Sequence, residues 1–356
     1  MTHFLFKFRR LLIPFQPFLG PALKIIITFS FLFLLLILTQ KIVGFATRHG
    51  VSGKDILSLA KDPRDVLATT DNLTNFLILG MRGEGSDSPD LTDTIIVASF
   101  SHNTRSITLL SVPRDLWINS LKIKINAAYH YGELKKTDGG LTLASAAIQE
   151  SLGVPIHYSV ALNFHGFIEL IDLLNGVDIN VEQGFTDSRF PIPGKENAYP
   201  ESTRYETISF SQGLQLMNGE TVLKFVRSRH ADGEEGTDFA RSRRQELLLS
   251  ALRQKIISTN FLLNKDKLNQ LYDIVNKNFS TDINPGLFPT MVRLALIARD
   301  SSLNSVTLSS EKIGSDIAVL ENPKPKDYDN QWVLIARDGN WEALKQYIHN
   351  RLTGVQ

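Results

Sequence analysis

A short arginine-rich segment is the part of this sequence best suited to chemistry on an anion. Residues 225–246 read FVRSRHADGEEGTDFARSRRQE, in which acidic side chains separate two groups of arginines. The arginines are Arg227, Arg229, Arg241, Arg243 and Arg244. A guanidinium group binds phosphoryl oxygens through two parallel hydrogen bonds, so it matches phosphate in geometry as well as in charge. The segment therefore predicts a binding site for an anion.

The composition of the whole chain makes that site a local one. The 356 residues include 38 lysines and arginines against 37 aspartates and glutamates, which leaves a formal charge of +1. A general nucleic-acid-binding protein normally has a basic excess, so nucleic acid is not expected as a partner. The sequence has no cysteine, which excludes disulfides, thiolate chemistry and cysteine-type zinc sites.

The spacing of the arginines predicts that they converge from two elements. Arg227 and Arg229 project from one side of an extended segment, whereas on a helix they would diverge by roughly 200°. Asp238, Arg241 and Gln245 stand at i, i+3 and i+7, so they share one helix face within about 60°. Asp238 is then placed to orient an arginine. The alternative is a solvated helix surface with weak, exposed ion pairs.

A second group of ionisable residues lies at the ends of two predicted strands. Asp93 begins the strand DTIIVASFS, while Arg114 and Asp115 follow the strand RSITLLSV directly after Pro113; Lys124 comes after a short connection. Ligands of α/β proteins gather at strand ends. Charged groups beside buried strands are costly unless they meet a partner or a ligand. These residues are therefore candidates for the same site.

The elements that must position both groups alternate between strands and helices. Apolar runs of strand length cover 75–80, 93–101, 105–112, 157–164 and 177–181. Helical spacing covers 141–152, 167–176, 218–226, 238–258, 261–277, 286–299 and 340–352. Residues 184–213 are rich in Gly, Pro and polar types and are expected to form a long surface excursion, and short strands are expected near 304–309 and 331–336. This alternation predicts an α/β sheet covered by helices on both faces.

The N-terminal region predicts a membrane anchor. Residues 25–39 contain no charge, and with their flanks they give an apolar segment at 21–45, close to the roughly 20 residues of a spanning helix. More basic residues precede this segment than follow it, which favours a cytoplasmic N-terminus. A cleaved signal peptide and a buried core helix are the alternatives.

The expected organisation follows from this anchor. Residues 1–20 would be cytoplasmic, residues 21–45 would span the cell membrane once, and residues 46–72 would form a stalk or helical lead-in. Residues 73–352 would then form one extracytoplasmic domain, because no linker or repeat divides them.

Several motifs in one order resemble a known family. They are LTDTIIVASFSHNTRSITLLSVPRD, KINAAYHYG, NFHGFIELIDLLNGVDINV, LMNGETVLKFVRSRH and DFARSRRQ. Together they are similar to the extracytoplasmic domain of the LytR-CpsA-Psr family, from about residue 75 to at least residue 256. The resemblance implies a three-layer α/β/α sandwich with a central mixed sheet. It also implies a membrane-anchored phosphotransferase that moves a glycopolymer from a polyprenyl-pyrophosphate carrier onto peptidoglycan, forming a phosphodiester link.

The resemblance also implies roles for individual residues. The expected pyrophosphate-binding residues are Arg114, Arg227, Arg229, Arg241, Gln245 and Lys124. The expected catalytic residues are Arg114, Asp93, Asp115 and Asp238, and a base for the acceptor hydroxyl is sought among the three aspartates. The expected cofactor is Mg²⁺, held by Asp93.

Two positions depart from the family pattern. Relatives usually have a metal-binding Asp in a Gly-x-Asp sequence after the first strand, where this chain has Arg82. Many also have an Arg at the position of Leu91. We therefore hypothesise that the loop RGEGSDSPD, with Arg82, Asp87 and Asp90, supplies a substitute, and Asp90 is the expected metal ligand. The alternatives for the whole protein are a polyprenyl-pyrophosphate hydrolase, with water as acceptor, and a non-catalytic envelope protein that binds or regulates an anionic polymer.

Overall fold

The computed structural model describes residues 53–83, 88–192, 194–195, 197–256, 264–312 and 317–354. The expected cytoplasmic segment 1–20 and the expected anchor 21–45 lie outside these residues. Among the helices in the described ranges, none combines the length and the apolar character needed to cross a bilayer.

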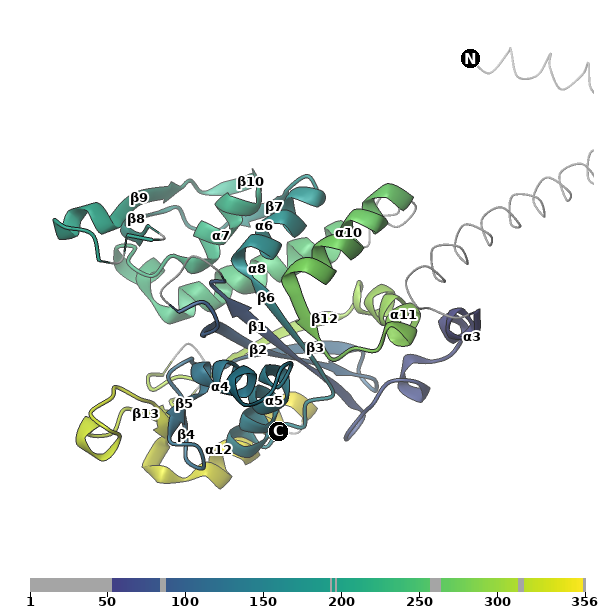
Figure 1. The fold of residues 1–356 in the computed structure, drawn as a ribbon, viewed down its shortest axis with the longest axis horizontal. Coiled ribbons are helices and arrows are strands. Elements are labelled where there is room, and N and C mark those ends of the chain that lie inside the picture. The colour runs from purple at the N-terminus through teal and green to yellow at the C-terminus, as the bar shows by residue number, and fades with distance from the viewer. Residues whose placement is uncertain are drawn as a thin grey trace, which may run out of the picture.

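A six-stranded sheet forms the centre of the molecule, with strand order β11-β6-β1-β2-β3-β12 (Figure 1). Its middle is an antiparallel meander of β1 (Leu73–Met81), β2 (Thr92–Ser101) and β3 (Ser106–Ser111). These are the three consecutive strands that the sequence predicts. Leu77, Val97 and Leu110 are fully buried along them, as expected for apolar runs covered on both faces.

The outer strands make the sheet mixed. β6 (Tyr158–Asn163) pairs in parallel with β1, and β12 (Ser302–Thr307) pairs in parallel with β3. β11 (Phe279–Thr281) adds an antiparallel edge beside β6. The prediction of an α/β fold around a mixed sheet is therefore confirmed.

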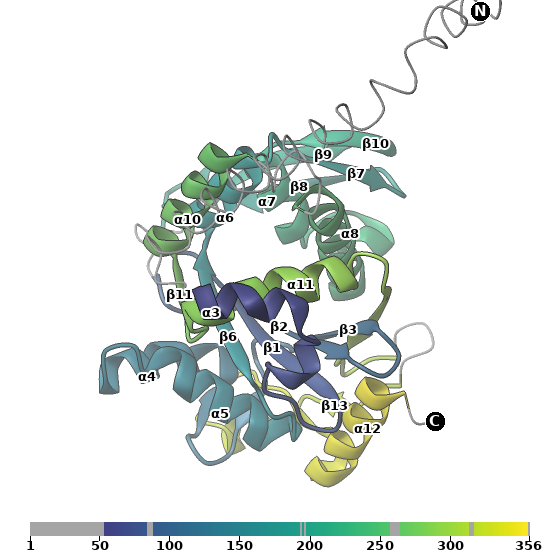
Figure 2. The same cartoon turned by 90° about the vertical axis from the view of Figure 1, so that its right-hand side faces the viewer.

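One face of the sheet is covered by α4 (Ala128–Lys135), α5 (Gly140–Leu152) and α12 (Trp341–Thr353), as both ribbon views show (Figures 1 and 2). Their apolar side chains and those of the sheet form one large core that includes Leu79, Ile148 and Ile348. Helix α5 ends at Gly153, which has φ +69°, as the sequence predicts for a glycine stop. Helix α4 was not predicted because it is short and mostly polar.

A second core lies above the opposite face. It is built from α6 (Phe164–Leu173), α7 (Gly219–Arg227) and α8 (Asp238–Ile256). Two strand pairs complete it: β7 (Val177–Val181) with β10 (Gly213–Met217), and β8 (Phe185–Pro191) with β9 (Tyr205–Phe210). At its centre Phe185, Phe210 and Phe225 pack with ring centroids 5.1–6.0 Å apart.

The structure differs from the sequence predictions at two places in this region. Residues 184–213, expected as a long surface excursion, contain the paired strands β8 and β9, which the sequence pattern did not predict. Buried residues alternate with exposed polar ones along both strands, and the polar residues hid the period of two in the sequence. Strand β7 does not join the central sheet either, because its partner is β10.

The remaining elements pack around the sheet. They include α10 (Lys265–Asn278), α11 (Phe288–Ala298), β4 (Trp117–Ile118), β5 (Ile123–Lys124), β13 (Leu320–Glu321), β14 (Ile335–Ala336) and α3 (Gly53–Ile56). Both α10 and α11 begin within the expected ranges. The lead-in is tied to the domain, because the buried hydroxyl of Thr290 donates to Ser58 Oγ over 2.8 Å.

Candidate functional site

The ends of β1, β2 and β3 bring three charged side chains together. Arg82 follows β1, Asp93 is the second residue of β2, and Arg114 follows β3. Arg82 Nε donates to Asp93 Oδ2 over 2.9 Å, and Arg114 Nη1 donates to Asp93 Oδ1 over 2.6 Å. The antiparallel register creates this meeting, because Met81 lies opposite Thr92 at the same edge of the sheet.

Asp93 is a stably ionised carboxylate. Burial raises its pKa, but hydrogen bonds from Arg82 and Arg114 and the positive charges of both groups outweigh burial and hold the pKa below its ordinary value. A carboxylate with a lowered pKa is a weak proton acceptor near neutral pH. The geometry therefore favours Asp93 as a residue that positions arginines over Asp93 as the general base.

Asp115 and Lys124 hold the other side of Arg114. Lys124 Nζ donates to Asp115 Oδ1 over 2.8 Å, and Asp115 Oδ2 lies 3.5 Å from Arg114 Nε. Arg114 is thus fixed between two carboxylates. Asp115 and Lys124 were expected to contact the substrate directly. In the structure, Asp115 lies against Arg114, and Lys124 binds Asp115, so the two residues hold Arg114 in place.

The paired arginines lie where α7 gives way to an extended segment. Arg227 is the last residue of α7, and Ser228 turns the chain with φ −55° and ψ 134°. The prediction that both arginines lie on one extended segment is therefore wrong for Arg227. Its guanidinium group packs over the ring of Phe164, 4.3 Å from the ring centre, which fixes its direction.

Asp187 of β8 fixes the extended segment, and the sequence gave no reason to single it out. Its side chain is fully buried, and Oδ2 accepts hydrogen bonds from Ser228 Oγ (2.7 Å) and from the backbone N–H groups of Arg229 and His230 (both 3.1 Å). Burial raises the pKa of Asp187, but these hydrogen bonds and one from the backbone N–H of Arg189 outweigh it, so the pKa is lowered. A lone Asp in a polar stretch carried no signal of this long-range contact.

Arg244 has a structural role. Its side chain is 3% exposed, its Nη1 donates to the Glu235 carboxylate over 2.7 Å, and its Nη2 donates to the carbonyl oxygen of Ser228 over 2.8 Å. Arg244 therefore ties helix α8 to the same extended segment that Asp187 holds from the other side.

These elements enclose a cavity of about 160 Å³. Its lining consists of Arg82, Asp93, Thr94, Arg114, Phe164, Pro191, Val226, Arg227, Arg229, His230, Arg241 and Gln245. We call it the arginine cradle. It unites most of the residues that the sequence singled out, including Arg82 at the position that departs from the family pattern. Asp238 begins α8, but its side chain is not among those that the structure describes.

A larger cavity of about 770 Å³ adjoins the cradle. The two share Asp93, Thr94, Arg114, Arg241 and Gln245. The larger cavity continues between the sheet and α8 past apolar side chains, among them Ile95, Val112, Leu308, Trp332 and Leu334. Glu234, Glu311 and Lys312 also line it. The basic junction and the apolar walls together suit a ligand with an anionic group at one end and a longer, less polar part.

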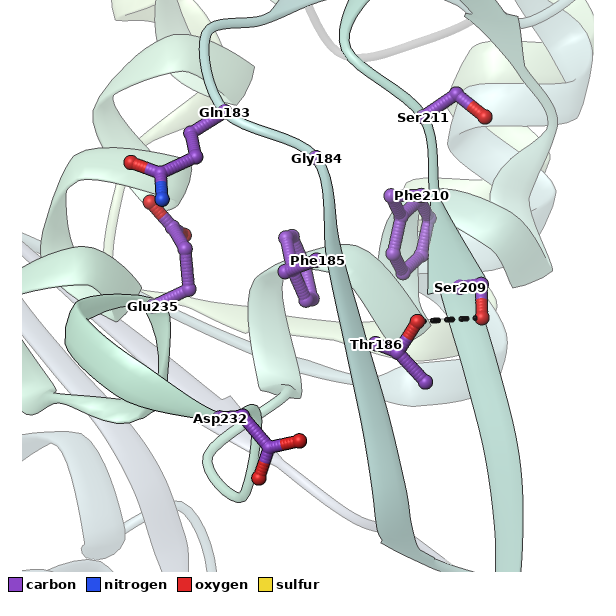
Figure 3. A pocket seen from close by; sticks show the side chains of 9 residues that line it. All are labelled: Gln183, Gly184, Phe185, Thr186, Ser209, Phe210, Ser211, Asp232 and Glu235. Atoms are coloured by element: carbon purple, nitrogen blue, oxygen red, sulfur yellow. Dashed lines mark hydrogen bonds between the residues drawn. The ribbon is translucent and has the colours of Figure 1, made fainter.

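A further pocket near β8 and β9 has a different character. Figure 3 shows the hydroxyl groups of Thr186 and Ser209 hydrogen-bonded across the two strands, with Asp232 and Glu235 on the other side of the pocket. No basic side chain is among the described residues that line it. Its described lining is thus acidic and polar, in contrast to that of the arginine cradle.

The described residues do not form a ready Mg²⁺ site. Within the ranges that the structure covers, no group of three or more His, Asp or Glu side chains is placed to hold a metal ion. Both oxygens of Asp93 face guanidinium groups. Asp90 is 46% exposed, lies 3.6 Å from His130 Nδ1 and lines neither cavity. Mg²⁺ usually needs only one or two protein carboxylates. Even so, neither Asp93 nor Asp90 is placed among the described residues to bind the predicted ion.

Comparison with known sequences points to one family. The model of the LytR_cpsA_psr family matches residues 43–337. The chain is 28% identical over 246 residues to the polyisoprenyl-teichoic acid–peptidoglycan teichoic acid transferase TagU of Oceanobacillus iheyensis, covering 68% of each protein. It is 26% identical over 235 residues to TagV of Bacillus subtilis, covering 64% of this chain but 52% of that protein. MsrR of Staphylococcus aureus, named a regulatory protein, is 25% identical over 285 residues, or 78% of this chain and 75% of MsrR.

Solved structures agree on the fold. Protein Lin1025 of Listeria innocua superposes with a TM-score of 0.55 at 22% identity, covering 80% of this chain and 99% of that one. TagT bound to LIIa-WTA gives a TM-score of 0.55 at 20% identity, covering 83% and 93%. At these identities the likeness establishes the fold alone.

Proposed function

The chain belongs to the LytR-CpsA-Psr family, and on that premise we propose that it transfers a glycopolymer from a polyprenyl-pyrophosphate carrier onto peptidoglycan. The observation that carries this proposal is the arginine cradle. Arg82, Arg114, Arg227, Arg229 and Arg241 reach one cavity from separate parts of the chain. The named transferases among the relatives, TagU and TagV, support the choice of substrate class.

The cradle suits phosphoryl transfer because such reactions need positioning and charge stabilisation more than covalent help from the protein. The pyrophosphate would lie among the guanidinium groups, each of which donates paired hydrogen bonds to phosphoryl oxygens. The adjoining cavity, with Val112 and Leu308 in its walls, would take the less polar part of the carrier.

The proposed step forms one bond and breaks one. A hydroxyl oxygen of peptidoglycan attacks the phosphorus bonded to the glycan, and the bond from that phosphorus to the bridging oxygen breaks. Polyprenyl phosphate leaves, the glycan becomes joined through a phosphodiester, and the hydroxyl proton passes to a base. Asp238 is the proposed base, because it begins the helix that also supplies Arg241 and Gln245 to the cradle.

The proposal includes the expected location. The segment 21–45 would anchor the chain in the cell membrane with the N-terminus in the cytoplasm. The domain would then meet both the lipid carrier and peptidoglycan on the outer side. Support for this placement comes from the uncharged run at 25–39 and the basic residues before it.

The test is a transfer assay with the full chain in detergent. The substrates are a polyprenyl-pyrophosphate-linked glycan and peptidoglycan fragments. Covalent glycan on peptidoglycan is the expected result, and Arg114→Ala is expected to reduce its rate by at least about a hundredfold. Release of lipid phosphate and free glycan phosphate would indicate a hydrolase instead. Retention of the substrate without turnover would indicate a binding protein.

A further inference from the structure

Arg82 stands at the position best placed for a cation beside Asp93. Its Nε lies 2.9 Å from Asp93 Oδ2, and the second oxygen of that carboxylate is bound by Arg114. A divalent cation on Asp93 would have two guanidinium groups as close neighbours. Repulsion between like charges is strong at such separations in a partly buried site, so the two guanidinium groups disfavour a divalent cation on Asp93.

Local backbone structure holds Arg82 in this place. It lies between the end of β1 and Gly83, which has φ +85° and whose N–H donates to the carbonyl oxygen of Pro89 over 3.1 Å. A Cβ on Gly83 would come within 2.9 Å of the Cβ of Asn163, so the chain passes close against β6 at this point. The turn therefore gives Arg82 a fixed origin beside the cradle.

The charge of the cradle already exceeds that of the proposed ligand. Its described lining holds five arginines and one aspartate, and these six side chains together carry four positive charges. A pyrophosphate joined at both ends carries one ionised oxygen on each phosphorus. The anion is therefore neutralised without a metal ion, whereas a site with a carboxylate at position 82 would carry two fewer positive charges.

We propose that Arg82 replaces the divalent cation, so that this protein binds and activates its pyrophosphate substrate without a metal. The proposal rests on the proposed function for the identity of the anion. Arg82 contributes a tethered charge and directional hydrogen-bond donors, and Asp93 orients Arg82 and Arg114 in place of holding a metal. The affinity for a prenyl diphosphate is then independent of the Mg²⁺ concentration.

The test measures binding of geranyl diphosphate to the full chain by calorimetry, first with EDTA and then with millimolar MgCl₂. The dissociation constants of the wild type are expected to agree within about twofold after correction for Mg²⁺ bound to the free ligand. A titration with Mn²⁺ followed by electron paramagnetic resonance is expected to find no tight Mn²⁺ site. Binding that disappears in EDTA, or a tight Mn²⁺ site, overturns the proposal.

Variants at position 82 give the converse test. Arg82→Asp is expected to weaken binding in EDTA at least about tenfold and to regain part of it with MgCl₂ or MnCl₂, because two carboxylates then face the ligand. Arg82→Gln, which adds no negative charge, is expected to weaken binding without any gain from the metal. If Arg82→Gln binds as tightly as the wild type, Arg82 has no role and the proposal fails.

The matched control is Arg105→Asp. Arg105 is exposed in the turn between β2 and β3, at the opposite end of β2 from Asp93, so the substitution makes the same change in charge far from the cradle. Its φ is +53°, a conformation that Asp adopts readily. This variant is expected to bind like the wild type in both conditions.

The transfer assay separates this inference from the proposed function. Metal-independent binding without transfer would contradict the proposed function and leave the inference standing. Transfer that requires Mg²⁺ would support the proposed function and contradict the inference about Arg82. If geranyl diphosphate fails to bind under both conditions, the pyrophosphate site is wrong and the inference falls with it.

Discussion

At the arginine cradle, each oxygen of Asp93 accepts a hydrogen bond from a different guanidinium group. The carboxylate is 18% exposed and the two arginines about one third exposed, so solvent weakens these pairs only in part. Removal of the carboxylate would leave two like charges facing each other. Asp93 is therefore both a stabilising residue and the one that sets the direction of Arg82 and Arg114.

This arrangement predicts an acid-sensitive stability. Because the folded pKa of Asp93 is lowered, its contribution is fully present above the ordinary carboxyl pKa of about 4 and is lost as the pH falls through the folded pKa. The difference in unfolding free energy between the wild type and Asp93→Asn is expected to shrink below about pH 4. Urea unfolding at several pH values measures this difference, and a constant difference across the range would contradict it.

Residue spacing revealed much of the cradle but not its supports. Arg227, Arg229 and Arg241 could be predicted because guanidinium groups have a recognisable chemistry, and Gln245 because helical spacing places it on one face with Arg241. Asp187 and Arg244 were not assigned their roles. Their partners lie far away in sequence or on the backbone, and a pattern of residue types does not encode such contacts.

At the scale of elements, the extended segment after α7 owes its shape to β8. The carboxylate of Asp187 accepts the N–H groups of Arg229 and His230, while Arg244 of α8 donates to the carbonyl oxygen of Ser228. The backbone N–H groups and a backbone carbonyl oxygen of the segment are therefore both hydrogen-bonded to side chains from other elements. This explains how a short, irregular stretch of chain presents an arginine in a defined direction.

Asp187→Asn tests this support. The amide presents N–H donors to backbone donors, so we expect a loss of about 2–3 kcal/mol in unfolding free energy. We also expect weaker binding of geranyl diphosphate under conditions in which the variant is still folded. The matched control is Asp178→Asn on β7, whose exposed carboxylate lies 3.5 Å from Lys255 Nζ. That change is expected to cost less than about 0.5 kcal/mol. Equal effects of the two changes would rule out the proposed support.

Helices and strands could be predicted where the apolar residues followed one clear spacing along the sequence. The apolar runs of β1, β2 and β3 and the glycine stop of α5 gave unambiguous signals. Strands β8 and β9 did not, because Phe190 and Ile208 face a separate small core while their neighbours are polar and the flanking sequence is rich in Gly and Pro. The choice between β10 and the central sheet as partner of β7 depends on tertiary packing, which local pattern does not report.

At the scale of the whole molecule, the cradle joins two cores. Asp93 and Arg114 lie at the ends of strands from the large core around the sheet. Arg227 is the last residue of α7, a helix of the smaller core, and Arg229 follows it. Arg241 of α8 completes the junction. A ligand in the cradle is thus in contact with both halves of the fold.

This junction predicts that an anionic ligand stabilises the whole domain. Geranyl diphosphate at about 100 times its dissociation constant should raise the unfolding free energy by about 2.7 kcal/mol, and with it the Tm. Hydrogen exchange should slow in α7 and at the start of β2 together. Arg114→Ala should abolish both effects, and protection confined to one core would contradict the bridging arrangement.

The two cavities share the residues at their junction, and this continuity has a kinetic consequence. The larger cavity leads from Asp93 and Arg114 toward Leu308 and Trp332, while the cradle leads toward Pro191 and His230. On the proposed function, the pyrophosphate of the donor lies at the shared residues and its less polar part lies in the larger cavity, so the acceptor can approach from the side of Pro191 and His230 while the donor is still bound. We expect sequential kinetics, with intersecting double-reciprocal plots for the two substrates. Parallel plots would contradict this and would indicate a ping-pong mechanism, in which the glycan phosphate is first transferred covalently to the protein.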